Sequence, residues 1–184
     1  SPKSLLVTSS LPSEGKTTTA TNTSISLAQT GARVLIIDAD MRRPRVHSVF
    51  GIQNNAGLSS ILSSELNEQD VLDAIQFDDR TKVSVMTSGP IPPNPAELVG
   101  SEQMTKLLKM LQKHFDHVVV DSPPITSFTD GVLDYARILQ QVRALPNAPT
   151  IALEMEDVSD MRLSLSYLNL PQSTDVWRNH IPSE

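Results

Sequence analysis

Short apolar runs alternate along most of the chain with segments in which apolar residues recur at helical spacing. The runs at 5–7, 33–37 and 118–120 contain no alternating polar residues, which is typical of strands covered on both faces of a parallel sheet. Between 104 and 111, apolar residues at i, i+3, i+4 and i+7 predict a helix that lies on a sheet. The predicted strands are 5–9, 33–38, 82–87 and 117–121, and the predicted helices are 16–30, 59–64, 68–76 and 95–114. This order predicts an α/β fold with a doubly wound, mainly parallel sheet flanked by helices.

The last third of the chain has a different pattern. From Asp134 a polar stretch predicts a helix to about Ala144, and Pro146 ends it. Two further strands are predicted at 150–155 and 161–168, the second with alternating apolar residues. We expect residues 1–184 to form one domain.

The loop between the first strand and the first helix has the composition of a phosphate-binding loop. Backbone N–H groups at a helix start can surround a triphosphate, with Lys16 reaching the outer phosphates and the Thr17 hydroxyl on Mg²⁺. Ser10 stands where such loops usually have their first glycine. An ordinary polar turn is the alternative, but it does not explain Gly-Lys-Thr at the helix start. The predicted nucleotide-binding residues are Pro12, Ser13, Glu14, Gly15, Lys16, Thr17 and Thr18.

Carboxylates follow two further predicted strands. Asp38 and Asp40 come at the end of one, and Asp121 ends another before Pro123 and Pro124 turn the chain out of the sheet. In an open parallel sheet the ligand lies beyond the carboxyl ends of the strands, so these groups should lie beside the phosphate-binding loop. One could hold Mg²⁺ and another accept a proton. The alternative is that an aspartate caps the next turn or helix.

These motifs resemble those of a known family. The chain resembles the cytoplasmic catalytic domain of a bacterial tyrosine autokinase, within the deviant Walker branch of P-loop proteins, which acts with a chain-length regulator of exopolysaccharide and capsule synthesis. The resemblance covers about residues 1–131, and residues 132–184 depart from it. The matching stretches are Pro12 within the first loop, Leu35 to Arg42, Gly57 to Leu62, Gly89 to Leu98, and Val118 to Pro124.

The resemblance implies an ATP-dependent, Mg²⁺-dependent protein-tyrosine kinase. Lys16 would clamp the phosphates, Asp38 would support the metal or the attacking phenol, and Thr17, Asp40 and Asp121 would serve the metal. The implied catalytic residues are Lys16, Asp38, Asp40 and Asp121. The implied partners are neighbouring kinase subunits and a membrane polysaccharide co-polymerase segment, fused upstream or separate, at the cytoplasmic side of the bacterial inner membrane.

Other interpretations stay open at this point. Partition-type ATPases of the same superfamily match less well, because Leu11 stands where they have an additional lysine. A nucleotide-binding module without kinase activity could act as a conformational partner of the co-polymerase, and the chain has only Tyr135 and Tyr167 as tyrosines of its own. The arginines at 42, 43 and 45 could meet phosphate or acidic residues, or form a solvated basic turn.

Composition and charge exclude several further classes of protein function. The net charge of −6 and pI of about 5.2 argue against a nucleic-acid surface, and no basic block offsets them. The chain has no cysteine, which excludes thiol catalysis and a disulfide framework. No run of about 18 apolar residues is present. Since Ser1 stands almost directly before the first strand, we expect an excised soluble domain whose membrane attachment would lie upstream.

Overall fold

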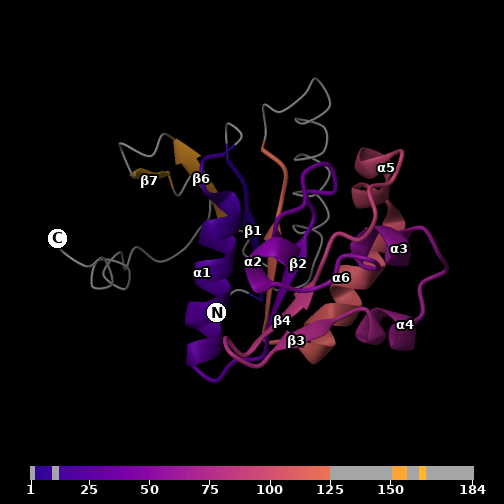
Figure 1. Ribbon diagram of the computed structural model, residues 1–184, viewed down its shortest axis with the longest axis horizontal. Helices are drawn as coiled ribbons and strands as arrows, with labels where there is room; N and C mark the ends of the chain where they lie inside the picture. Colours follow the sequence, from indigo (N-terminus) through magenta and orange to yellow (C-terminus); the bar gives the residue numbers. More distant parts are fainter. Residues whose placement is uncertain (1–2, 10–12, 125–150, 157–161, 165–184) are drawn as a thin grey trace.

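A mainly parallel sheet forms the centre of the fold (Figure 1). The computed structural model describes residues 3–9, 13–124, 151–156 and 162–164. In these residues the strand order is β3-β4-β2-β5-β1-β6-β7, with β3 and β7 antiparallel at the two edges and the inner strands parallel. The strands are β1 Ser4–Val7, β2 Val34–Asp38, β3 Gln76–Asp78, β4 Val83–Met86, β5 His117–Asp121, β6 Ile151–Glu156 and β7 Arg162–Ser164.

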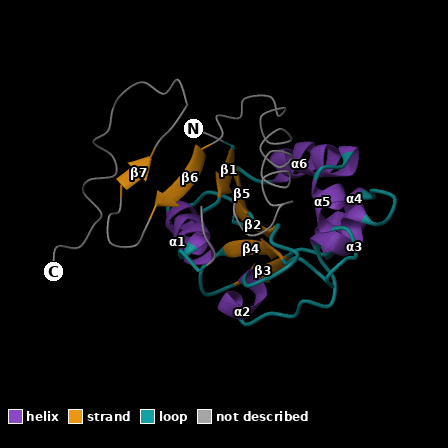
Figure 2. Ribbon diagram, turned by 90° about the horizontal axis from the view of Figure 1, so that it is seen from above, coloured by secondary structure: helices purple, strands orange, loops and turns teal. Residues whose placement is uncertain are grey.

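Helices cover both faces of the sheet, as Figure 2 shows from above. One face carries α1 (Lys16–Gln29) and α2 (Val46–Phe50). The other carries α3 (Leu58–Leu62), α4 (Glu68–Asp73), α5 (Pro95–Val99) and α6 (Glu102–His114). The predicted doubly wound α/β fold is therefore confirmed.

The inner strands are apolar throughout because neighbouring side chains point to opposite faces and both faces are covered. On β2, Leu35 and Ile37 pack toward α3–α6, whereas Ile36 packs toward α1. On β5, Val120 packs on the side of α3–α6 and Val119 packs on the side of α1. Each inner strand thus contributes to two separate cores.

Most predicted elements agree with the structure, and the differences have local causes. The predicted helix 95–114 is two helices, because Gly100 and Ser101 interrupt it and the Ser101 hydroxyl accepts the Met104 N–H at 3.3 Å, which caps α6. The predicted helix 68–76 ends at Asp73, and Gln76 begins β3. The short helix α2 was not predicted. The strand predicted at 150–155 is confirmed as β6 beside β1, whereas the helix predicted to Ala144 lies outside the described residues.

The two glycine-containing stretches singled out in the sequence contact each other. The N–H groups of Leu58 and Ser59 donate to the carbonyl oxygens of Thr87 and Ser88, both at 2.8 Å. This joins the start of α3 to the segment that leaves β4. Gly57 must be glycine here because a Cβ would collide with backbone atoms of Thr87 and Gly89, which cannot move aside as a side chain could.

We therefore expect Gly57→Ala to lower the free energy of unfolding by about 1–3 kcal/mol, since overpacking against backbone is not relieved by rotamer changes. Urea unfolding followed by circular dichroism measures this. Ser60→Ala on exposed α3 surface is the control and should stay within about 0.5 kcal/mol of the wild type. If the glycine variant unfolded at the same urea concentration as the control, this explanation of Gly57 would be wrong.

Candidate active site

The parallel register brings three chain segments to one rim of the sheet. Asp38 at the end of β2 lies opposite Asp121 at the end of β5, and Asp121 lies opposite Val7 of β1. The phosphate-binding loop follows β1. The carboxyl ends of the three strands therefore meet at the edge where ligands bind in open α/β sheets, as predicted.

The loop enters α1 through left-handed backbone conformations. Ser13 has φ 68° and Gly15 has φ 83°, and Gly15 accepts the first helical hydrogen bond from the Thr19 N–H at 2.8 Å. No heavy atom lies near a Cβ built at Gly15, so its backbone conformation, and not the space around it, requires glycine. Lys16 is buried at the start of the helix, whereas Thr18 is exposed. Pro12 lies outside the described residues.

Thr17 and Asp121 form the central contact of the site. The Thr17 hydroxyl donates to Oδ2 of Asp121 at 2.7 Å, across 104 positions of sequence. The other carboxylate oxygen, Oδ1, is buried and has no hydrogen-bond partner in the described part of the chain. A buried carboxylate oxygen without a donor is costly, and a cation offsets that cost.

Asp38 holds the loop that follows β2. Its Oδ2 accepts the N–H groups of Arg45 and Val46, both at 3.0 Å, and its Oδ1 accepts the Asp40 N–H at 3.2 Å. The capping role considered as the alternative in the sequence is thus present in the structure. A catalytic role of Asp38 stays a prediction.

Burial raises the pKa of all three carboxylates, and the charges of neighbouring carboxylates add to the shift at Asp38 and Asp121. Burial, with the nearby charge of Asp121, raises the pKa of Asp38 to about 8. Burial also raises the pKa of Asp121 to about 6, although the Thr17 hydroxyl and Lys16 oppose the shift. The pKa of Asp40 is raised by burial too, and backbone N–H groups and Lys16 moderate the effect. Lys16 is therefore the cation that acts on both Asp40 and Asp121.

The residues present fit a magnesium ion. Mg²⁺ usually takes one or two carboxylates and completes its shell with water and substrate phosphates. Asp121 with the adjacent Thr17 hydroxyl meets this requirement, and Asp40 supplies a second buried carboxylate nearby. Within the described residues no three His, Cys, Asp or Glu side chains converge as a metal cage, which a site completed by phosphate oxygens does not need.

Comparison with known proteins gives the family. The AAA domain family matches residues 13–134, well over half of the chain. The chain belongs to this family.

Its relatives include bacterial tyrosine kinases, which confirms the resemblance noted from the motifs. The chain is 44% identical over 129 residues to the tyrosine-protein kinase YwqD of Bacillus subtilis, covering 70% of this chain and 53% of YwqD. The VpsO kinase domain matches with a TM-score of 0.73 and 28% identity over 89% of this chain and 74% of that one. The kinase domain of the Escherichia coli tyrosine kinase Etk matches with a TM-score of 0.66 and 28% identity over 83% of this chain and 66% of that one.

The chain spans about half the length of YwqD. In the part of the chain that the structure describes, no helix has both the length and the apolar character needed to span a bilayer.

Two hydroxyl groups that the sequence analysis did not single out brace the rim. The Ser122 hydroxyl donates to the carbonyl of Val7 at 3.0 Å, and the Thr8 hydroxyl donates to the carbonyl of Pro123 at 3.2 Å. These bonds extend the contact between β1 and β5 beyond the last paired residues and keep Asp121 beside the loop. The sequence signal that could have identified these two residues is that each is a small hydroxyl residue close after an apolar run.

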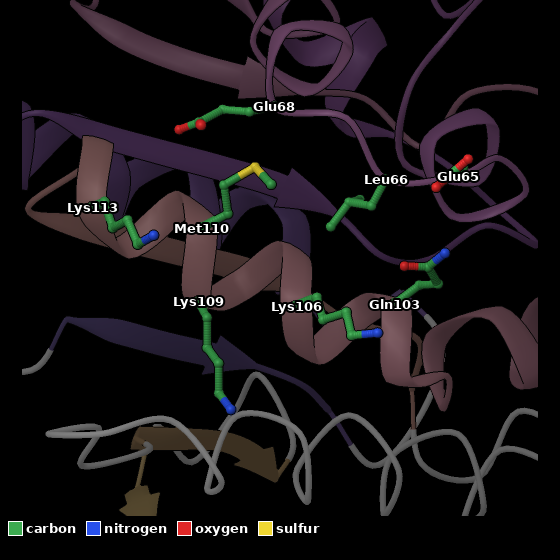
Figure 3. A pocket seen from close by; sticks show the side chains of 8 residues that line it. All are labelled: Glu65, Leu66, Glu68, Gln103, Lys106, Lys109, Met110 and Lys113. Atoms are coloured by element: carbon green, nitrogen blue, oxygen red, sulfur yellow. The ribbon is translucent and has the colours of Figure 1, made fainter.

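A surface cleft of about 520 Å³ lies between α4 and α6 (Figure 3). Lys106, Lys109 and Lys113 line it together with Met110 and Leu66. Since α6 ends at His114, just before the amino end of β5, the second half of α6 lies toward the end of the sheet opposite the rim. None of the candidate active-site residues lines the cleft, so it is separate from the candidate active site.

Because burial raises the pKa of Asp121, we expect the folded domain to be more stable when this carboxylate carries no charge. The unfolded state loses this proton near pH 3.8 and the folded state at about pH 6, so the group destabilises the fold increasingly as pH rises across that interval. In EDTA at pH 7.5, Asp121→Asn should raise the free energy of unfolding by about 1–3 kcal/mol, and the gain should vanish near pH 4. Urea unfolding at both pH values tests this.

Asp116→Asn is the matched control, because the pKa of Asp116 is shifted in the opposite direction to that of Asp121. The Arg33 guanidinium lowers the pKa of the half-exposed Asp116 to about 2, so the stabilisation by this ion pair is present above pH 3.8 and is lost as pH falls toward 2. The control should therefore show no gain at pH 7.5. Equal behaviour of the two variants would contradict the burial argument.

Proposed function

We propose that the chain is the ATP-dependent, Mg²⁺-dependent catalytic domain of a protein-tyrosine kinase that regulates exopolysaccharide or capsule synthesis. The observation that carries the proposal is the contact between Thr17 and Asp121, with Lys16 acting electrostatically on Asp121 and Asp40. The names of YwqD, Etk and VpsO as kinases support the choice of reaction.

Each residue at the rim has a stated task in this proposal. Lys16 and the loop residues from Ser13 to Thr18, with Pro12 before them, bind the phosphates through charge and backbone N–H groups. Thr17, Asp40 and Asp121 hold Mg²⁺, directly or through water. When bound, the ion neutralises charge that develops on the phosphates during transfer.

The acceptor is a tyrosine hydroxyl. Its oxygen bonds to the γ-phosphorus as the bond between that phosphorus and the leaving oxygen of ADP breaks, and the phenolic proton passes to a carboxylate. Asp38 is our choice for that carboxylate, because it ends β2 directly opposite Asp121. With a pKa raised to about 8, it accepts the proton only in its ionised form, whose fraction grows as pH rises. Its ties to backbone N–H groups fix its position.

The wider setting is also a proposal. We infer that a membrane polysaccharide co-polymerase, as a separate chain or an upstream segment, holds the domain at the cytoplasmic side of the inner membrane beside other kinase subunits. The relatives' greater length supports a larger assembly. Tyrosines of neighbouring subunits would then be the substrates.

The test combines nucleotide binding with phosphotyrosine detection. We expect calorimetry to show Mg²⁺-dependent ATP binding that Lys16→Met weakens about tenfold or more, since a buried charge-assisted contact is lost. Lys109→Met, an exposed lysine on α6, should bind ATP like the wild type. A tyrosine-containing peptide should become phosphorylated by the wild type and the control only.

The other outcomes separate the alternatives. ATP binding without phosphotyrosine would favour the module without kinase activity that acts as a conformational partner of the co-polymerase. Equal ATP binding by the wild type and Lys16→Met would contradict the nucleotide site itself.

A further inference from the structure

The loop from Ala39 to Val46 presents two arginines on a fixed backbone. The Arg43 N–H donates to Oδ1 of Asp40 at 3.1 Å, and the Arg45 N–H donates to Oδ2 of Asp38 at 3.0 Å. Both acceptors are buried, so the main chain at each arginine is anchored to the site. The side chains themselves are exposed.

Neither arginine side chain is paired with a carboxylate in the described residues. Two other exposed arginines among the described residues are paired: Arg33 lies 2.9 Å from Asp116, and Arg80 lies 3.1 Å from Asp78. The positive charge of Arg43 acts on Asp40, which places it at the site. These two exposed side chains, carried on a loop whose backbone is bonded to the buried Asp38 and Asp40, are called the arginine patch below.

That patch answers an electrostatic difficulty of the proposed reaction. The chain carries a net charge of −6, and Asp38, Asp40 and Asp121 lie where an acceptor must approach. An acidic polypeptide would be repelled there unless cationic side chains met it first. Guanidinium groups suit this task because they bind carboxylates with two parallel hydrogen bonds.

The position of the loop favours a polypeptide over the nucleotide. The arginines follow β2, whereas the phosphate-binding loop follows β1, and β5 lies between the two strands. Two strand spacings amount to about 10 Å. Lys16, at the start of α1 directly after the phosphate-binding loop, already acts electrostatically on Asp121 and Asp40.

We propose that Arg43 and Arg45 select the protein substrate by binding acidic residues that flank the acceptor tyrosine. This inference rests on the proposed kinase function, and it adds the substrate class and the residues that recognise it. The arginines act in binding and positioning the substrate, whereas the chemical step stays with the groups at the rim.

The test compares two labelled peptides on the full chain with Mg²⁺-ADP present. One peptide has a central tyrosine among glutamates, and the other has glutamines in their place. By fluorescence anisotropy, we expect the wild type to bind the acidic peptide about tenfold more tightly than the neutral one. The double variant Arg43→Ala with Arg45→Ala should bring that ratio close to one, and the double change to lysine should restore part of it.

Lys109→Ala with Lys113→Ala is the matched control. It also removes two positive charges, from exposed side chains of α6 that line the cleft in Figure 3, and should keep the wild-type ratio. In the phosphorylation assay, the arginine double variant should show its loss in the KM for the acidic peptide.

Three outcomes would overturn the proposal. The first is that the wild type shows no preference for the acidic peptide, and the second is that the lysine control loses the preference as much as the arginine double variant does. The third is that the arginine double variant loses Mg²⁺-ATP affinity while its peptide ratio stays unchanged, which would assign the arginines to nucleotide phosphates. An arginine-dependent peptide preference without phosphotyrosine would support the docking surface and refute the kinase function.

Discussion

Burial of mutually repelling carboxylates at one rim of the sheet is the constraint on which the rest of the site depends. Parallel pairing places Asp38 directly opposite Asp121, and both are almost fully buried. Water does not screen such groups well, so each raises the free energy of ionising the other. The sheet that stabilises the domain thereby also creates a local excess of negative charge, partly offset by Lys16.

That charge explains the form of the surrounding loops. The segment after β2 folds back so that its N–H groups donate to Asp38 and Asp40, which lowers the cost of burying them. On the other side, the Thr17 hydroxyl donates to Asp121. One oxygen of Asp121 is left without a donor in the described residues, and this is where a cation gives the greatest benefit. The fold thus gives up stability at the position where its proposed chemistry needs charge.

Much of this arrangement could be predicted from the sequence. The apolar runs that form β1, β2, β4 and β5 have little polar alternation, and the chemical groups follow them directly, so the topology of an α/β sheet places them together. The short elements α2 and β3 could not be predicted in the same way. Each spans one turn or three residues, and Phe77 of β3 is exposed, so neither leaves a clear periodicity.

The separate roles of Asp38 and Asp40 also could not be predicted from the sequence alone. Spacing alone does not tell whether Asp38 faces a ligand or its own loop, because the answer depends on the return of the Arg45 and Val46 N–H groups. The contact between Gly57 and the segment after β4 is similarly non-local, although both stretches were noticed as motifs.

The most direct test of this account is the number of protons released when Mg²⁺-ADP binds at pH 6.5, measured by calorimetry in two buffers of different ionisation enthalpy. A cation that takes up the negative charge of Asp121 and its neighbours lowers their pKa values, so about half a proton to one proton should leave the protein. A binding enthalpy that is the same in both buffers would mean that no proton leaves. The buried carboxylates would then not be the groups that meet the metal.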